Sequence, residues 1–380
     1  LSAVDSTSAD PLERTQVVFE WLANHVAHGR TRDPHTVLLQ RRGDRTGLFV
    51  AMLRALDIPV QIVRARTGRA PVIAPSYPDT RDYPETLVRI TTGDRTTWAD
   101  MGRASPWLGQ LPPQFQEGHY LTRSDEGAPV VRPFVDGDVA QWPVATALDL
   151  DVRRDGDASG TLRMTFPGTY GADLARLLSA ARPEDRKRQM QRWLTSLMPS
   201  AQLQELDVLS RATSVAPLVV TASVAVPGFM SVDRDHLVLE DFFSRPMTGR
   251  FLGQPGLREY VSLPRRRLPL LISPTFEVST VHVRFPPSVA SPQEAPRTFV
   301  RTADFGRFEQ SFEWDDKSKT ARMERRRIMP LRRIAPEAFS AFRDNAQSVL
   351  QVSRNRLIVP LGAPIKTAAV MPAPICRAAP

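Results

Sequence analysis

The chain has 380 residues, of which 42% are hydrophobic and 24% charged, a composition typical of a globular protein with two or three domains. It contains no apolar run of the roughly eighteen residues that a membrane-spanning helix needs, no zinc spacing, no phosphate loop and no dinucleotide fingerprint. The net charge is +9, but the arginines that dominate the basic residues are mixed with acidic ones throughout, so we expect no nucleic-acid binding.

An amphipathic helix is predicted over residues 10–28. Asp10 suits its N-cap and Pro11 its first turn, and apolar residues then recur along one face at helical spacing. His25 and His28 lie three residues apart near the end of this helix. Because no carboxylate pattern completes a metal site, we interpret them as ordinary residues at a helix C-terminus and predict no metal.

A second helix is predicted after Gly43, with Asp44 as its N-cap and an apolar stripe that ends before Pro59. The tripeptide Arg-Gly-Asp that ends at Asp44 is explained by this cap and not by cell adhesion. Three strands follow, and the last two form a predicted hairpin around Gly93-Asp94. These strands are expected at residues 60–65, 85–91 and 95–100.

Residues 102–143 are rich in proline, glycine and polar residues, so we expect them to connect two domains across a surface. Beyond them the sequence predicts a hairpin around Asp155-Gly156, two helices, and then short alternating strands typical of a β-sandwich or an antiparallel sheet with inserted helices. The later helices are expected at 172–181, 183–198 and 335–353, and the later strands at 203–210, 217–226, 276–286, 297–305, 307–316 and 320–329.

The predicted fold class is therefore α+β, with a β-rich second half. The expected divisions are an α+β domain over residues 1–105, a connecting segment over 106–145, a β-rich domain over 146–355 and a Pro/Ala-rich tail over 356–380. The single cysteine, Cys376, lies in this tail. It excludes an internal disulfide framework, and it is a poor nucleophile because no rigid element would hold it.

The first part of the chain resembles the transglutaminase-like domains of bacteria, which share the papain-type cysteine fold. The resemblance is carried by "RTQVVFEWLANHV", "LFVAMLRALDIPVQIVRA" and "ETLVRITTGDRTTWAD" and covers residues 10 to 105. A later phrase, "RDGDASGTLRMTFPGTYGADLARLL", resembles, less specifically, the C-terminal part of bacterial proteins that pair this domain with a domain of unknown function. The resemblance implies a papain-like transglutaminase-type domain in a protein that is often exported.

Active members of that family place a cysteine after Gly-Asp at a helix N-terminus, a histidine in a strand about forty residues on, and an aspartate on the next strand. Carried over residue by residue, these positions hold Arg45, Glu85 and Asp100. A guanidinium stays protonated and cannot attack a carbonyl, and no histidine occurs between His35 and His119. The resemblance therefore implies a degenerate triad, with no catalytic residue and no cofactor.

We hypothesise that Arg45 pairs with Glu85 and Asp100 in a salt-bridge cluster within the former cleft; separate drift, with Arg45 facing solvent, is the alternative. Thr46 carries the hydroxyl nearest to the lost thiol. Thr46 and Trp98 are the candidates to contact a bound partner, although Trp98 also suits the core.

The sequence thus predicts a pseudoenzyme: a non-catalytic protein-binding or scaffolding module of a larger bacterial protein. One alternative is a transamidase or peptidase-like hydrolase with an unrecognised nucleophile. Another is a glycan-binding envelope module, which would expose Phe308, Phe312 and Trp314 in a row. We expect a protein or peptide partner, and the net positive charge also allows an acidic partner. The expected location is periplasmic, extracellular or in the cell envelope, with any export signal upstream of Leu1.

Overall fold

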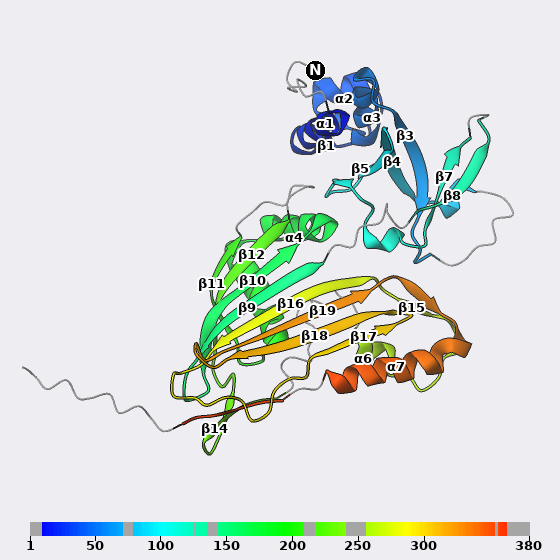
Figure 1. Ribbon diagram of the computed structural model, residues 1–380. Coiled ribbons are helices and arrows are strands. Elements are labelled where there is room, and N and C mark those ends of the chain that lie inside the picture. The colour runs from blue at the N-terminus through cyan, green and yellow to red at the C-terminus, as the bar shows by residue number, and fades with distance from the viewer. Residues whose placement is uncertain are drawn as a thin grey trace, which may run out of the picture.

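Two large β-sheets organise the chain, and helices pack on each of them (Figure 1). The computed structural model describes residues 10–70, 79–124, 127–135, 143–208, 217–240, 256–353 and 356–362. Its architecture is α+β with a β-rich C-terminal part, as predicted. Within these ranges no helix is both long and apolar enough to cross a bilayer.

The N-terminal part consists of a six-stranded antiparallel sheet with the order β6-β5-β4-β3-β7-β8 and three helices packed on it. Apolar side chains of the helices, such as Val18, Leu22, Phe49 and Leu53, share a core with Val88 of the sheet. The elements are α1 (Pro11–His25), β1 (Ala27–His28), α2 (Pro34–Gln40), β2 (Arg42–Gly43), α3 (Arg45–Ala55), β3 (Val60–Arg66), β4 (Glu85–Thr92), β5 (Arg95–Asp100), β6 (Trp107–Gly109), β7 (His119–Arg123) and β8 (Pro129–Pro133), with 3-10 turns at Thr80–Asp82 and Pro113–Phe115.

The predicted helix starts are confirmed by their caps. The Asp10 carboxylate accepts from the Leu12 amide at 2.9 Å, and the Asp44 carboxylate accepts from the amides of Thr46 and Gly47 at 3.0 and 3.2 Å. Gly43, just before this second cap, has no room for a side chain, because a Cβ there would come within 2.3 Å of Val37 and 2.7 Å of a carbonyl oxygen. The Gly-Asp pair therefore fixes where α3 begins.

The expected surface connection over residues 102–143 is wrong for most of its length. Strands β6, β7 and β8 lie there and belong to the same six-stranded sheet as β3, β4 and β5. Trp107, Leu111, Phe115 and Tyr120 from this segment are buried. Its many prolines and glycines kept the strands short, and short strands at a sheet edge tolerate proline, so the composition concealed them.

The C-terminal part is built on an eight-stranded mixed sheet with the order β11-β12-β10-β9-β16-β19-β18-β17. Only β9 and β16 run parallel within it; the other neighbours are antiparallel. Its strands and the helices near its two ends are β9 (Val144–Val152), β10 (Ala158–Phe166), α4 (Gly168–Ala180), α5 (Pro183–Leu197), β11 (Gln202–Val208), β12 (Leu218–Val226), α6 (Leu257–Tyr260), β16 (Thr275–Arg284), β17 (Phe299–Ala303), β18 (Gly306–Asp315), β19 (Thr320–Met329) and α7 (Phe339–Val352).

Helices cover this sheet at both ends. Helices α4 and α5 pack near β10, β11 and β12, whereas α6 and α7 pack near β17 and β18 (Figure 1). The predicted hairpin around Gly156 is present, with φ of +84° at that glycine. The sequence placed the helices and long strands of this part within a few residues of their observed bounds.

A small three-stranded sheet shares the core of the β-rich part, and the sequence prediction missed it. Its strands are β13 (Ser231–Asp233), β14 (His236–Glu240) and β21 (Arg356–Pro360). Strand β21 falls in the segment expected as a tail, so the predicted tail is wrong at its start; Cys376 lies outside the described residues. A two-stranded sheet of β15 (Leu270–Ile272) and β20 (Arg332–Ile334) and a 3-10 turn at Pro336–Ala338 complete the elements.

Candidate functional site

The start of α3, the start of β4 and the end of β5 come together in the N-terminal part. Arg45 and Thr46 are the first two residues of α3, Glu85 is the first residue of β4, and Asp100 is the last residue of β5. A Cβ placed on Gly102 would lie 3.5 Å from Oδ1 of Asp100 and 3.9 Å from Oγ1 of Thr46. The turn after β5 therefore lies directly against the first turn of α3.

An arginine that the sequence analysis did not single out joins the two carboxylates of this site. Nε of Arg103 donates to Oδ2 of Asp100 at 2.7 Å, and its Nη2 donates to Oε2 of Glu85 at 3.2 Å. Oδ1 of Asp100 also accepts from the Gly102 amide at 3.0 Å. One planar guanidinium thus holds the end of β5 and the start of β4 together.

The predicted pairing of Arg45 with the two carboxylates is wrong. In the part of the chain that the structure describes, the Arg45 guanidinium makes no ion pair with Glu85 or Asp100, and its Nη2 donates instead to the carbonyl oxygen of Arg103. The alternative, an Arg45 that faces solvent, is also wrong because the residue is only 5% exposed. Arg45 lies beneath the ion-paired cluster, and its guanidinium binds the backbone carbonyl of Arg103.

Burial sets the direction of the pKa shifts of Asp100 and Arg45, whereas the two carboxylates set that of Arg103. Burial raises the pKa of Asp100 above its ordinary value, against the opposing effects of Arg103 and the Gly102 amide. Burial likewise lowers the pKa of Arg45, and Asp100 opposes that shift. For Arg103, burial is outweighed by Asp100 and Glu85, which together raise its pKa. The site holds two arginines and two carboxylates whose charges nearly balance.

The two predicted partner-binding residues are buried. Thr46 is 7% exposed, and Trp98 is 1% exposed, with its ring packed edge to face against Tyr120 and Phe134. Trp98 therefore belongs to the core and offers no surface to a partner, which corrects its assignment as a cleft residue. The exposed groups of the site are the side chains of Glu85 and Arg103, at 33% and 36%.

The aromatic row expected of a glycan-binding module is not exposed. Phe308 is 5% exposed, and Phe312 and Trp314 pack against the core of the β-rich part. Since residues two apart in a strand face the same side, all three point toward the covered face of the sheet. A flat aromatic platform for sugars is therefore absent at these positions.

The histidines singled out from the sequence lie apart from the site. His25 packs its ring on Trp21, and its Nδ1 is 2.8 Å from the carbonyl oxygen of that residue, while the Gly29 amide donates to His28. Within the described ranges, no cluster of histidine, cysteine, aspartate and glutamate has the geometry to hold a metal ion.

Arg103 was the main omission of the sequence analysis, and a signal for it existed. It follows Asp100 by three residues, across a turn that contains Gly102. In such a tight turn, a long side chain can fold back onto the carboxylate at the strand end. The family pattern that located Arg45, Glu85 and Asp100 does not include the position of Arg103.

Comparisons with known proteins leave the family of the chain open. No family model and no curated protein matches it. Among solved structures, the chain is similar to a crystal structure from Parabacteroides distasonis described as a "putative protease", with a TM-score of 0.45 and 12% sequence identity over 95% of this chain. The chain spans 54% of the length of that protein. At this TM-score the likeness carries no argument about fold or function.

Proposed function

We propose that the chain is a non-catalytic transglutaminase-like protein that acts as a protein-binding or scaffolding module of a larger bacterial protein of the cell envelope. The family resemblance of residues 10 to 105 supplies the positions at which a papain-type site would place its cysteine, histidine and aspartate. Those positions hold Arg45, Glu85 and Asp100. Their surroundings support a binding role in preference to a catalytic one.

The observation that carries this proposal is the bridge that Arg103 makes between Asp100 and Glu85. Catalysis of the papain type needs a thiolate beside an imidazole that a carboxylate orients. Here Arg103 forms an ion pair with Asp100, the residue at the aspartate position. A second arginine, Arg45, is buried at the start of α3. The arrangement holds three elements together, and its triad positions carry neither a thiol nor an imidazole.

The surface of this cluster supports recognition of a protein or peptide. Glu85 and Arg103 are each about one-third exposed, so a partner can contact the cluster from solvent while its lower part stays buried. A partner's carboxylate would compete with Glu85 for the guanidinium, which can hold two acceptors at once. An acidic segment is the partner chemistry that this geometry and the net charge of +9 favour.

The alternative hydrolase would have to use Thr46, and its surroundings argue against this. Thr46 is 7% exposed; the neighbouring Asp44 carboxylate caps the helix by accepting from the amides of Thr46 and Gly47, and Asp100 is already bound to Arg103. A hydroxyl needs an adjacent general base to become a nucleophile. No observation favours this alternative over the binding role.

The test is affinity capture from an extract of the organism of origin, with the full chain as bait in three forms. Arg103→Gln removes the partly exposed positive charge of the cluster, and Arg95→Gln removes an exposed positive charge at the start of β5 as a matched control. Loss of a charge-assisted hydrogen bond should reduce recovery of a specific partner about tenfold with Arg103→Gln only. Thermal unfolding of both baits checks that they are folded. Equal recovery with all three baits would show that the cluster is not the binding surface.

A further inference from the structure

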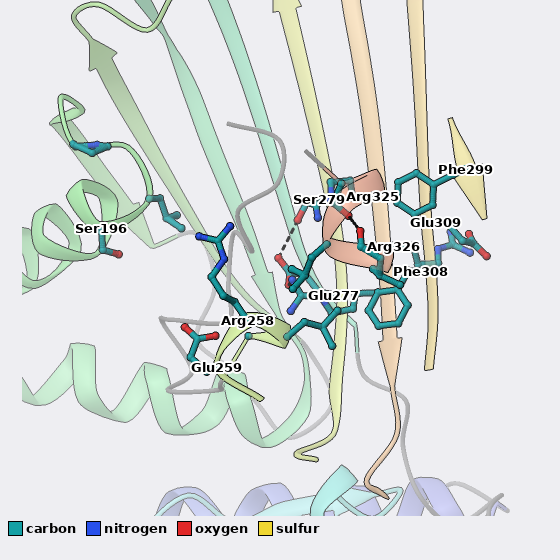
Figure 2. Close-up of a pocket in the computed structure, with 18 of the residues that line it drawn as sticks. Ser196, Arg258, Glu259, Glu277, Ser279, Phe299, Phe308, Glu309, Arg325 and Arg326 are labelled. Atoms are coloured by element: carbon teal, nitrogen blue, oxygen red, sulfur yellow. Dashed lines mark hydrogen bonds and ion pairs between the residues drawn. The ribbon is translucent and has the colours of Figure 1, made fainter. Parts of the chain in front are cut away.

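A cavity of about 550 Å³ opens in the β-rich part, far along the chain from the cluster around Arg103. The end of α5, the short helix α6 and the end of α7 form its walls, and strands β16, β18 and β19 form its floor (Figure 2). A volume of this size is typical of pockets for small organic ligands and short peptides. None of the residues singled out around α3, β4 and β5 lines it.

The floor of this cavity is polar although it lies on the covered face of the sheet. Strand pairing aligns Ser279 with Arg325 in one row across the sheet, and Glu277 with Arg327 in the next row. One row further along the same face, Val281 pairs with Met323, and both are buried in the apolar core. The covered face therefore changes from apolar to charged where the cavity begins.

Burying these charges is costly unless they have partners. Glu277 and Ser279 are 4% and 5% exposed, and the Arg327 side chain is 13% exposed. The Ser279 hydroxyl donates to Oε1 of Glu277 at 3.1 Å, as Figure 2 shows. Nη2 of Arg327 lies 3.7 Å from Oε2 of Glu277, which is longer than a hydrogen bond. The pair is thus close enough for attraction, and both side chains line the cavity.

The lining selects a ligand that carries both signs of charge. Both arginines and glutamates line the cavity, and Figure 2 shows Arg258 and Glu259 of α6 on the side opposite Arg325. A simple anion would meet the buried Glu277 carboxylate, and a simple cation would meet the arginines. Apolar side chains, among them Leu257 and Phe308, complete the walls.

We propose that this cavity binds a zwitterion with an apolar side chain, namely an α-amino acid or a short peptide with free ends. Its carboxylate binds Arg327 and Arg325, its ammonium group binds Glu277, and its side chain lies against Leu257 and Phe308. This assignment rests on the cavity alone and is independent of the function proposed for the N-terminal cluster.

Isothermal titration calorimetry with the full chain tests the proposal in two arms. The probes are leucine, a tripeptide of leucine and alanine with free ends, and the same tripeptide acetylated and amidated. We expect at least one of the two free-ended probes to bind. If the free tripeptide binds, the blocked tripeptide should bind about tenfold more weakly. Binding of leucine alone identifies an amino-acid site, and binding of the tripeptide identifies a peptide site.

The second arm uses two glutamate variants. Glu277→Gln should weaken the free-ended probe about tenfold. Glu313→Gln, at an exposed position of β18 that does not line the cavity, should leave binding unchanged. Because Glu277→Gln disturbs a buried pair, the blocked and free probes with the unmodified chain provide a test that needs no variant. No heat from any probe at millimolar concentration, or equal binding of blocked and free tripeptides, would overturn the proposal.

Discussion

At the scale of single residues, the candidate site depends on which arginine reaches the carboxylates. Arg103 follows Asp100 by only three residues, and its side chain folds back over the turn to reach the Asp100 carboxylate. Arg45 is the first residue of α3, and its guanidinium donates to the carbonyl oxygen of Arg103 and not to the two carboxylates. The neighbouring Gly102 amide binds the other oxygen of Asp100, so the carboxylate is oriented from two sides.

Substitution of Asp100 by asparagine measures whether burial or the ion pair dominates at this position. Because burial raises the pKa of Asp100, the folded state binds more protons than the unfolded state between its ordinary pKa and the raised one. The free energy of unfolding of the unmodified chain should therefore fall as the pH rises through this window. Asparagine does not titrate, so Asp100→Asn should gain stability relative to the unmodified chain on going from acidic to neutral pH.

Urea unfolding of both forms over that pH range is the measurement. The opposite trend, with the variant losing about 1–3 kcal/mol relative to the unmodified chain at neutral pH, would mean that the hydrogen bonds from Arg103 outweigh burial. Glu85 remains as a partner of Arg103 in the variant, so the arginine is not left unpaired. The two outcomes therefore differ in sign.

The residues that a sequence can predict here are those whose role is local. Asp44 caps α3 because its side chain reaches amides two and three residues ahead, and Asp10 does the same for α1. The approach of Glu85 to Asp100 needs the register of a sheet, and the sequence suggested it only through a family resemblance. The role of Arg103 depends on a turn geometry that alternation and periodicity do not encode.

At the scale of elements, strongly patterned segments were predicted well and short edge segments were missed. Strands such as β12 alternate buried and half-buried residues along their whole length. This alternation is visible in the sequence as apolar residues at every second position. Strands β6 and β8 have three and five residues beside prolines, too few for such a pattern. Strand β21 stands just before a Pro/Ala-rich stretch, and the composition of that stretch hid it.

Strand β21 should contribute measurably to stability although it lies in the segment predicted as a tail. Leu357 is fully buried in the core of the β-rich part, so Leu357→Ala should lower the free energy of unfolding by about 2–5 kcal/mol. Arg356→Ala, one residue earlier, removes an exposed side chain that pairs with Glu240 and should cost under about 1 kcal/mol. Urea unfolding of both variants would refute a structural role for β21 if their costs were equal.

At the scale of the whole molecule, specific side chains join the N-terminal and β-rich parts. The Ser105 hydroxyl lies 3.5 Å from the carbonyl oxygen of Ala172 in α4. The Gln116 side chain accepts from the Leu331 amide at 2.8 Å, and Arg332 donates to Glu117 at 2.8 Å. The segment expected to separate two domains therefore supplies a sheet edge and much of the contact between the two parts.

Contacts between residues far apart in the sequence cannot be predicted from local sequence patterns. The parallel pairing of β9 with β16 joins strands more than a hundred residues apart, and the pairing of β16 with β19 brings Glu277 beside Arg327 in the floor of the cavity. Glu277 and Arg327 lie in segments that the sequence predicts as strands, at 276–286 and 320–329. Only their pairing in the sheet shows that they lie on the covered face.

The central claim is that the site around Arg45 carries out no chemistry, and steady-state turnover tests it most directly. The unmodified chain and Thr46→Val are incubated with a fluorogenic peptide amide, and separately with a glutamine-containing peptide and a primary amine. Because valine has the shape of threonine without the hydroxyl, both forms should remain folded, and we predict that neither exceeds the uncatalysed rate of hydrolysis or amide exchange. Turnover by the unmodified chain that disappears in Thr46→Val would contradict the claim.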